Sequence, residues 1–206
     1  QTILTNLSAG TSSSSQFQLT VDKRMSHGLQ FRAAYTLAKT IDDNSGFRQR
    51  TATRTDANNP RLDRGLADFD STHRFVISPI WQIPLGSHGS SRFSKIAGGW
   101  SVATITSFQS GTPFSIYSNN NSSESDNFLD RADVIGPVQI FKDPRVIRTF
   151  SPSPDGIHGS CLSGTETGNF YFDPTNLVCA TGVAGGVPLF SHGNMGRNVL
   201  RGPGLN

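Results

Sequence analysis

The amino-acid sequence predicts an all-β fold of antiparallel strands, and three observations predict it. Hydrophobic residues make up only 34% of the 206 positions, whereas 21 glycines, 11 prolines and many Ser, Thr and Asn residues supply turns. Four segments alternate apolar and polar side chains with a period of two, as a strand with one apolar face does. The connections between these segments also alternate between shorter and longer lengths.

The first two predicted strands cover about residues 16–23 and 29–37. One face of the first strand carries Phe17, Leu19 and Val21, and one face of the second carries Phe31, Ala33, Tyr35 and Leu37. Residues 24–28 are few enough to join the two strands as a hairpin.

The third strand is predicted over residues 74–83, with Phe75, Ile77, Trp81 and Ile83 on one face. Pro79 is expected to interrupt its hydrogen-bond ladder, because proline has no backbone N–H. The fourth strand is predicted over residues 99–117, with a bend at the Gly-Thr-Pro sequence of residues 111–113.

The longest connections are predicted to be the loops of residues 38–73 and 118–206, the second containing short local strands. Transmembrane barrels combine compact turns at one rim with long loops at the outer rim. We therefore expect residues 1–206 to form a single segment of an outer-membrane β-barrel with long outer loops. A soluble β-sandwich or small barrel is the alternative fold, with a secreted or extracellular location.

The segments that carry these features resemble one family, the Oar-like TonB-dependent receptors, which have a carboxypeptidase-regulatory-like domain. The matching stretches are FQLTVDKRMSHGLQFRAAYTLAKTIDD (17–43), RGLADFDSTHRFVISPIWQIPLG (64–86), GGWSVATITSFQSGTPFS (98–115) and GNMGRNVLRGPGLN (193–206). They occur in the family's order and cover nearly the whole chain.

The resemblance implies a receptor for the uptake or binding of a bulky extracellular solute in the bacterial outer membrane. It implies four partners: outer-membrane lipid, the remaining barrel strands and plug, TonB through an N-terminal part, and the solute. In such relatives further strands follow the GxxGRNxLRGPG stretch, so the chain is expected to be a C-terminal-region fragment of the barrel. A subset of strands leaves unpaired edges, so it is not expected to transport anything alone.

A charged stretch in the first long loop is the candidate ligand-binding site. The planar guanidinium group of arginine binds anionic or sugar-like solutes through paired hydrogen bonds. The alternative is that these opposite charges pair with one another and with water. The candidate residues are Arg48, Arg50, Arg54, Asp68, Asp70 and His73. No metal site is predicted, because Asp68, Asp70 and His73 have no further partner at ligand spacing.

The two cysteines and two tryptophans carry further predictions. Cys161 and Cys179 are expected to form a disulfide in a loop-like region, which requires an oxidising compartment. Trp81 and Trp100 lie near strand ends, where barrels place an aromatic girdle, although ordinary core packing explains them equally well.

No catalytic residue and no cofactor are predicted. Nucleophilic catalysis has only the sequence His158-Gly159-Ser160-Cys161, with Asp155 or Asp173 as an orienting acid. The net charge of +3 is spread without a basic run, which argues against nucleic-acid binding. The alternative functions are a soluble secreted all-β hydrolase acting on polysaccharide, with glycosidase-like chemistry, and a surface adhesion module.

Overall fold

The computed structural model describes residues 10–45, 55–56, 59–84, 99–118, 130–179 and 191–204. The chain divides into two compact units. The strand unit comprises Ser15–Lys39, Ser71–Ser110 and Gly204–Asn206, and the loop unit comprises Gln1–Ser14, Thr40–Asp70 and Gly111–Pro203. The strands and loops that were predicted as one barrel segment over residues 1–206 are thus distributed over two units.

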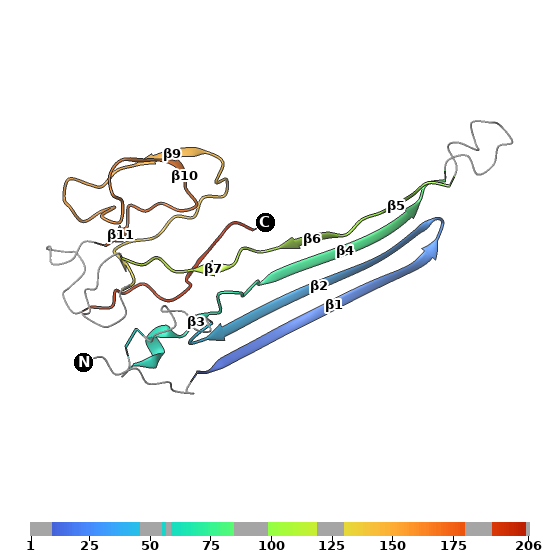
Figure 1. Cartoon of the computed structure of the whole chain (residues 1–206), viewed down its shortest axis with the longest axis horizontal. Coiled ribbons are helices and arrows are strands. Elements are labelled where there is room, and N and C mark those ends of the chain that lie inside the picture. The colour runs from blue at the N-terminus through green and yellow to red at the C-terminus, as the bar shows by residue number, and fades with distance from the viewer. Residues whose placement is uncertain are drawn as a thin grey trace, which may run out of the picture. The chain divides into compact units, whose positions relative to one another are not determined.

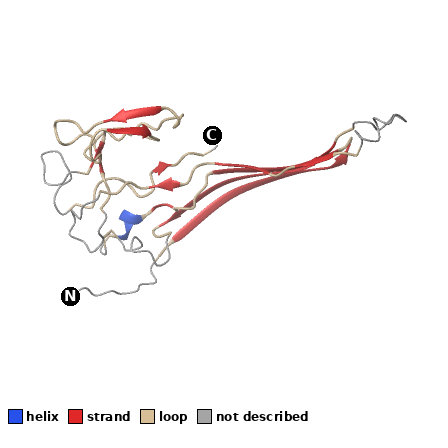
Figure 2. Cartoon of the chain, turned by 45° about the horizontal axis from the view of Figure 1, so that its top comes forward, coloured by secondary structure: helices blue, strands red, loops and turns tan. Residues whose placement is uncertain are grey.

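The all-β prediction is confirmed, because nearly all regular structure consists of antiparallel strands. The main sheet has the order β1-β2-β4-β5, with β3 paired to β2 and β6 paired to β4. Its strands are β1 (Ser12–Ser26), β2 (Leu29–Asp42), β3 (Gly65–Leu66), β4 (His73–Gln82), β5 (Ser101–Ala103) and β6 (Thr106–Gln109). The strands β1, β2 and β4 run side by side in Figures 1 and 2.

The sheet of the strand unit has one apolar and one polar face. Cross-strand pairs such as Phe31 with Pro79 and Tyr35 with Phe75 fix which residues share a face. The apolar face carries Phe17, Leu19, Val21, Phe31, Ala33, Tyr35, Phe75, Ile77, Trp81, Val102 and Phe108. The salt bridge between Arg32 and Asp22, 2.6 Å long, lies on the opposite face. The predicted period-two alternation therefore holds across neighbouring strands.

Pro79 explains why the fourth predicted strand is divided. Its register places residues 104–105 between β5 and β6, because Ile80 pairs with Ala103 and Ile77 with Thr106. The Thr104 N–H still donates to the Pro79 carbonyl over 3.2 Å, but proline has no N–H to return the bond. The segment predicted as a strand over residues 99–117, with a bend at residues 111–113, is therefore divided into three strands, and the last division falls at the predicted bend. The segment consists of β5, β6 and the short β7 (Pro113–Phe114).

The first two predicted strands are correct in position but too short, whereas the third, predicted over residues 74–83, is His73–Gln82. The first two extend from the predicted 16–23 and 29–37 to Ser12–Ser26 and Leu29–Asp42, so the loop predicted from residue 38 begins after Asp42. Ladder hydrogen bonds join backbone groups and continue where the apolar alternation ends. Between them His27 and Gly28 have φ of 53° and 76°, as a two-residue type I′ hairpin turn requires.

The loop unit contains the described hydrophobic core. Leu177, Met195 and Leu200 form its centre, and Phe114, Ile116, Val134, Val138, Cys161 and Phe172 pack around it. Three two-stranded ladders surround the core. They pair β7 with β12 (Leu200–Arg201), β8 (Asp133–Val134) with β11 (Leu177–Val178), and β9 (Ile147–Phe150) with β10 (Glu166–Asn169). The short strands predicted within residues 118–206 are therefore present, and a 3-10 helix, η2 (Pro60–Asp63), lies within the first loop.

Candidate functional site

The most extensive polar network of the loop unit is centred on residues 193–202, which we call the strap. Its C-terminal part forms β12 and pairs Leu200 with Phe114 and Arg201 with Pro113. Its N-terminal part is bonded through the Met195 N–H, which donates to the Ala132 carbonyl over 3.2 Å. The strap thus connects segments that lie far apart in the sequence.

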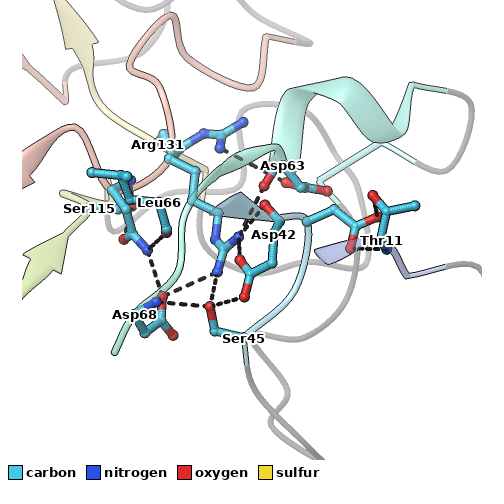
Figure 3. A network of polar contacts seen from close by, with 11 residues as sticks. Thr11, Asp42, Ser45, Asp63, Leu66, Asp68, Ser115 and Arg131 are labelled. Atoms are coloured by element: carbon cyan, nitrogen blue, oxygen red, sulfur yellow. Dashed lines mark hydrogen bonds and ion pairs between the residues drawn. The ribbon is translucent and has the colours of Figure 1, made fainter. Parts of the chain in front are cut away.

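Arg197 donates more than one hydrogen bond from each terminal nitrogen in this network, and Figure 3 shows the network around Asp42, Ser45, Asp63 and Asp68. Its Nη1 donates to Asp42 Oδ1 over 2.6 Å and to the carbonyls of Asp42 and Asp63 over 3.1 and 3.2 Å. Its Nη2 donates to Ser45 Oγ over 2.6 Å and to Asp68 Oδ1 over 3.2 Å. Because the Asp42 side chain is only 4% exposed, this guanidinium compensates a carboxylate that water cannot reach.

Asn198 continues the network with both its side chain and its backbone. Its Nδ2 donates to the Leu66 carbonyl over 2.7 Å and to Asp68 Oδ1 over 2.6 Å. Its backbone N–H donates to Ser115 Oγ over 2.8 Å, and that hydroxyl donates to Asn198 Oδ1 over 3.1 Å. Asn198 has a φ of 55°, a left-handed conformation that asparagine tolerates better than most residues.

Asp70 is held in the same manner by a second strap arginine. Its Oδ1 accepts the backbone N–H of Thr40 over 2.7 Å, and its Oδ2 accepts Nη2 of Arg201 over 2.6 Å. Nη1 of Arg201 also donates to the Gly111 carbonyl over 3.1 Å. Each carboxylate oxygen of Asp70 therefore has a donor inside the protein.

A further buried arginine, Arg131, lies beside this network. Its Nη1 is 3.9 Å from Asp63 Oδ1, and the Asp63 carboxylate accepts hydrogen bonds from the backbone N–H and hydroxyl of Thr55. Burial lowers the pKa of the Arg131 guanidinium below its ordinary value, while Asp63 acts in the opposite direction. Burial therefore disfavours the charged form of Arg131, and Asp63 offsets this only in part.

Glycines allow the backbone of the strap to approach its neighbours closely. A Cβ on Gly111 would lie 1.9 Å from the Gly202 carbonyl oxygen, and one on Gly65 would lie 2.4 Å from that of Arg197. Gly193 has a φ of 74°, and a Cβ there would lie 1.9 Å from the Arg131 carbonyl oxygen. These positions exclude every larger residue unless the backbone moves.

Three of the predicted ligand-binding residues lie among the described residues. Oδ1 of Asp68 accepts hydrogen bonds from Arg197 and Asn198, and Oδ2 of Asp70 accepts one from Arg201. His73 lies in the strand unit, where its Nδ1 is 2.7 Å from Tyr35 Oη. Arg48, Arg50 and Arg54 lie outside the described residues. The role of these six residues in ligand binding therefore stays a prediction.

The two cysteines form a disulfide, with a Cα–Cα distance of 4.8 Å. Cys161 packs against the core of the loop unit.

Within the strand unit, Trp81 and Trp100 are 47% and 64% exposed and neither belongs to the described core. Of the two interpretations of these tryptophans, core packing therefore finds no support in the described residues.

The structure forms only part of the arrangement that nucleophilic catalysis at Ser160 would need. His158 Nδ1 lies 2.6 Å from Asp155 Oδ2, as in the acid–base half of a triad. The Ser160 hydroxyl, however, accepts the backbone N–H of Cys179 over 3.0 Å. Asp155 Oδ1 also accepts the N–H groups of Ile157 and His158, which assigns this carboxylate to a turn.

Within the described ranges no His, Cys, Asp or Glu group has the geometry of a metal site.

Sequence reasoning singled out Asp68 and Asp70, but not the other residues that build the network, which are Asp42, Asp63, Arg197, Asn198 and Arg201. The bonded pair Asp42 and Arg197 is 155 positions apart in the sequence. A signal was nevertheless present, because three of these five residues lie in the GNMGRNVLRGPGLN stretch that carries the family resemblance. Polar and glycine positions in so compact a motif indicate backbone and charge constraints.

An antiparallel sheet with one exposed apolar face is the kind of structure from which the wall of a membrane β-barrel is built. The comparison with protein families identifies the class: the chain matches the outer membrane beta barrel domain over residues 1–206, and it belongs to that family. It is thus a protein of the bacterial outer membrane. Searches of curated proteins and of solved structures found no match. In the described residues no helix is both long and apolar enough to cross a membrane.

Proposed function

We propose that this chain is part of a TonB-dependent receptor that binds or takes up a bulky extracellular solute. The strand unit contributes to the barrel wall and contacts outer-membrane lipid, and the loop unit belongs to the outer loops. The remaining barrel strands and plug complete the transporter, and TonB acts through the N-terminal part of the receptor. The resemblance of the four sequence segments supports this class.

The observation that carries the lipid-facing role is the uncovered apolar face of the sheet. Phe17, Leu19 and Val21 of β1 are 57%, 52% and 49% exposed. Contiguous apolar surface of this kind on a strand whose other face is polar is typical of a wall between lipid and an aqueous lumen.

The structure of the loop unit supports a role in solute binding. Long outer loops bind well only when they are held in a defined conformation. Here the disulfide, the strap and the apolar core provide that order. Ile147 and Tyr171 remain 69% and 41% exposed, so the ordered loops also present apolar and aromatic groups for contact.

The lipid-facing role is tested by a matched pair of substitutions on adjacent residues of β1. Leu19→Arg places a charge on the apolar face and is expected to cost about 2–4 kcal/mol of folding free energy in lipid vesicles. Thr20→Arg places the same charge on the opposite face and should cost far less. Urea titrations of the complete barrel in vesicles measure both. Equal costs for the two variants would contradict the assignment of the faces.

The receptor role is tested by uptake in cells that carry the complete receptor. Fluorescein-labelled peptides and oligosaccharides too large for porins serve as the probes. Their accumulation should require the receptor and TonB, and an uncoupler should abolish it. Accumulation that persists without TonB would contradict the TonB-dependent class while leaving the outer-membrane location intact.

A further inference from the structure

The strap bonds to four separate segments of the loop unit. Arg197 contacts the end of β2 and residues 63–68, and Arg201 contacts Asp70. The strand β12 pairs with β7, and Gly202 donates to Thr112. The fourth segment, around Val134, is bonded to the side chain of Asn194. The Oδ1 of Asn194 accepts the Val134 N–H over 2.7 Å, and its Nδ2 donates to the Val134 carbonyl over 3.1 Å.

Two of these segments, 40–45 and 63–70, cannot leave the strap without leaving a buried carboxylate unpaired. Asp42 and Asp70 are 4% and 2% exposed, and their carboxylates depend on Arg197 and Arg201. A buried charge without its partner is strongly unfavourable. Release of the strap from one segment therefore favours opening and hydration of the adjoining segments as well, because a local opening alone would leave a buried charge unpaired.

The close glycine contacts prevent the strap from adjusting its position. Gly111, Gly65 and Gly193 each bring a neighbouring backbone to within a distance at which no Cβ fits. Gly193 belongs to the strap itself, so a shift of the strap by one residue would place the side chain of His192 or Asn194 where a Cβ lies 1.9 Å from the Arg131 carbonyl oxygen. The strap is thus either docked along its length or released.

We propose that the strap couples the four segments into one cooperative opening unit, so that residues 40–45, 63–70, 111–115 and 130–134 open together. Arg197 and Arg201 are positioning residues in this device, since each acts through the carboxylates that it holds. The outer loops would then switch between a closed and a released state as a body. This inference goes beyond solute binding and does not depend on it.

Native-state hydrogen exchange of the complete protein in detergent micelles, followed by mass spectrometry, tests the coupling. Arg197→Ala should raise exchange on the order of tenfold in all four segments. The decisive readout is in residues 111–115 and 130–134, to which the Arg197 side chain donates no hydrogen bond within the described part of the chain, although its charge acts on Arg131. A rise confined to residues 40–45 and 63–70 would overturn the proposal.

A second arginine of the same unit provides the matched control. Arg148 donates to the carbonyls of Asp143 and Val146 and lies 3.9 Å from the centre of the Phe141 ring. Arg148→Ala should therefore change exchange near β9 alone. If Arg197→Ala does not fold, Arg197→Lys keeps the charge without the fork and should produce a smaller rise with the same four-segment pattern. A uniform rise that includes residues 15–39 of the strand unit would also contradict a separate unit.

Discussion

The guanidinium of Arg201 donates to Asp70 Oδ2 over 2.6 Å, and the Asp70 side chain has no exposed surface. A carboxylate in that position is not stabilised by water, so its charge depends on the arginine and on the Thr40 N–H. The arginine side chain is itself 31% exposed. The pair is therefore asymmetric, because loss of the arginine leaves the more buried partner alone.

The first prediction follows from this asymmetry. Arg201→Ala should lower the free energy of unfolding by about 2–4 kcal/mol, somewhat less than for a pair buried on both sides. The neutral double variant Asp70→Asn with Arg201→Gln should recover part of the loss. Urea titrations monitored by tryptophan fluorescence measure both.

The control for that prediction is the exposed pair in the strand unit. Arg32 and Asp22 are 71% and 54% exposed, so Arg32→Ala should change stability little. If Arg32→Ala were as costly as Arg201→Ala, burial of the partner would not be the cause.

The second prediction concerns the approach of Gly111 to the strap. Gly111→Ala places a Cβ 1.9 Å from the Gly202 carbonyl oxygen, and backbone must move to accommodate it. We expect a destabilisation at the upper end of about 1–3 kcal/mol. The matched control is Gly168→Ala in β10, where a Cβ meets no atom within 4 Å. Thermal unfolding of the two variants should separate clearly, and equal midpoints would refute the close approach.

The third prediction concerns the turn at Asp155. The Ile157 N–H and the His158 side chain hold the pKa of Asp155 at about 2, below its ordinary value of 3.8. A depressed carboxyl pKa stabilises the fold above the unfolded value, and that contribution is lost as the pH falls from 3.8 through about 2.

The titration is observable at one amide. In protein labelled with ¹⁵N-isoleucine, the Ile157 resonance should shift with a midpoint near 2, and Asp155→Asn should abolish this transition. A midpoint near 3.8 in the unaltered protein would show that the carboxylate does not hold the turn.

The fourth prediction concerns the disulfide, which links residues 18 positions apart. Replacement of both cysteines by alanine should cost about 3 kcal/mol, because the unfolded chain regains the entropy of an open loop. Protease sensitivity of residues 161–179 should increase, while the strands of the main sheet keep their resistance. The reduced unaltered protein is the companion sample, and resistance in both samples would argue against this role.

Much of the strand unit was predictable because strand periodicity is local. The alternation of Phe17, Leu19 and Val21 with polar neighbours fixes a face without knowledge of any partner strand. Pro79 predicted an interruption of the hydrogen-bond ladder. The interruption lies where β4 pairs with β5 and β6, and not where β4 pairs with β2. This depends on register and appeared only in the structure.

The polar network was much less predictable. The sequence predicts Asp68 and Asp70 as ligand-binding residues together with Arg48, Arg50 and Arg54, which are their neighbours along the chain. Their arginine partners come from the strap, 129 and 131 positions away. Ion pairs carry no sequence periodicity, so proximity along the chain is a poor guide to them.

By itself the sequence determined the antiparallel strands, the apolar and polar faces of the sheet, the hairpin near Gly28 and the membership of an outer-membrane class. These properties follow from the side-chain alternation of single strands and from short motifs. Only the tertiary structure decided which charges neutralise Asp42 and Asp70, because desolvated ions are stabilised by whichever partner the folded chain brings within a few ångströms.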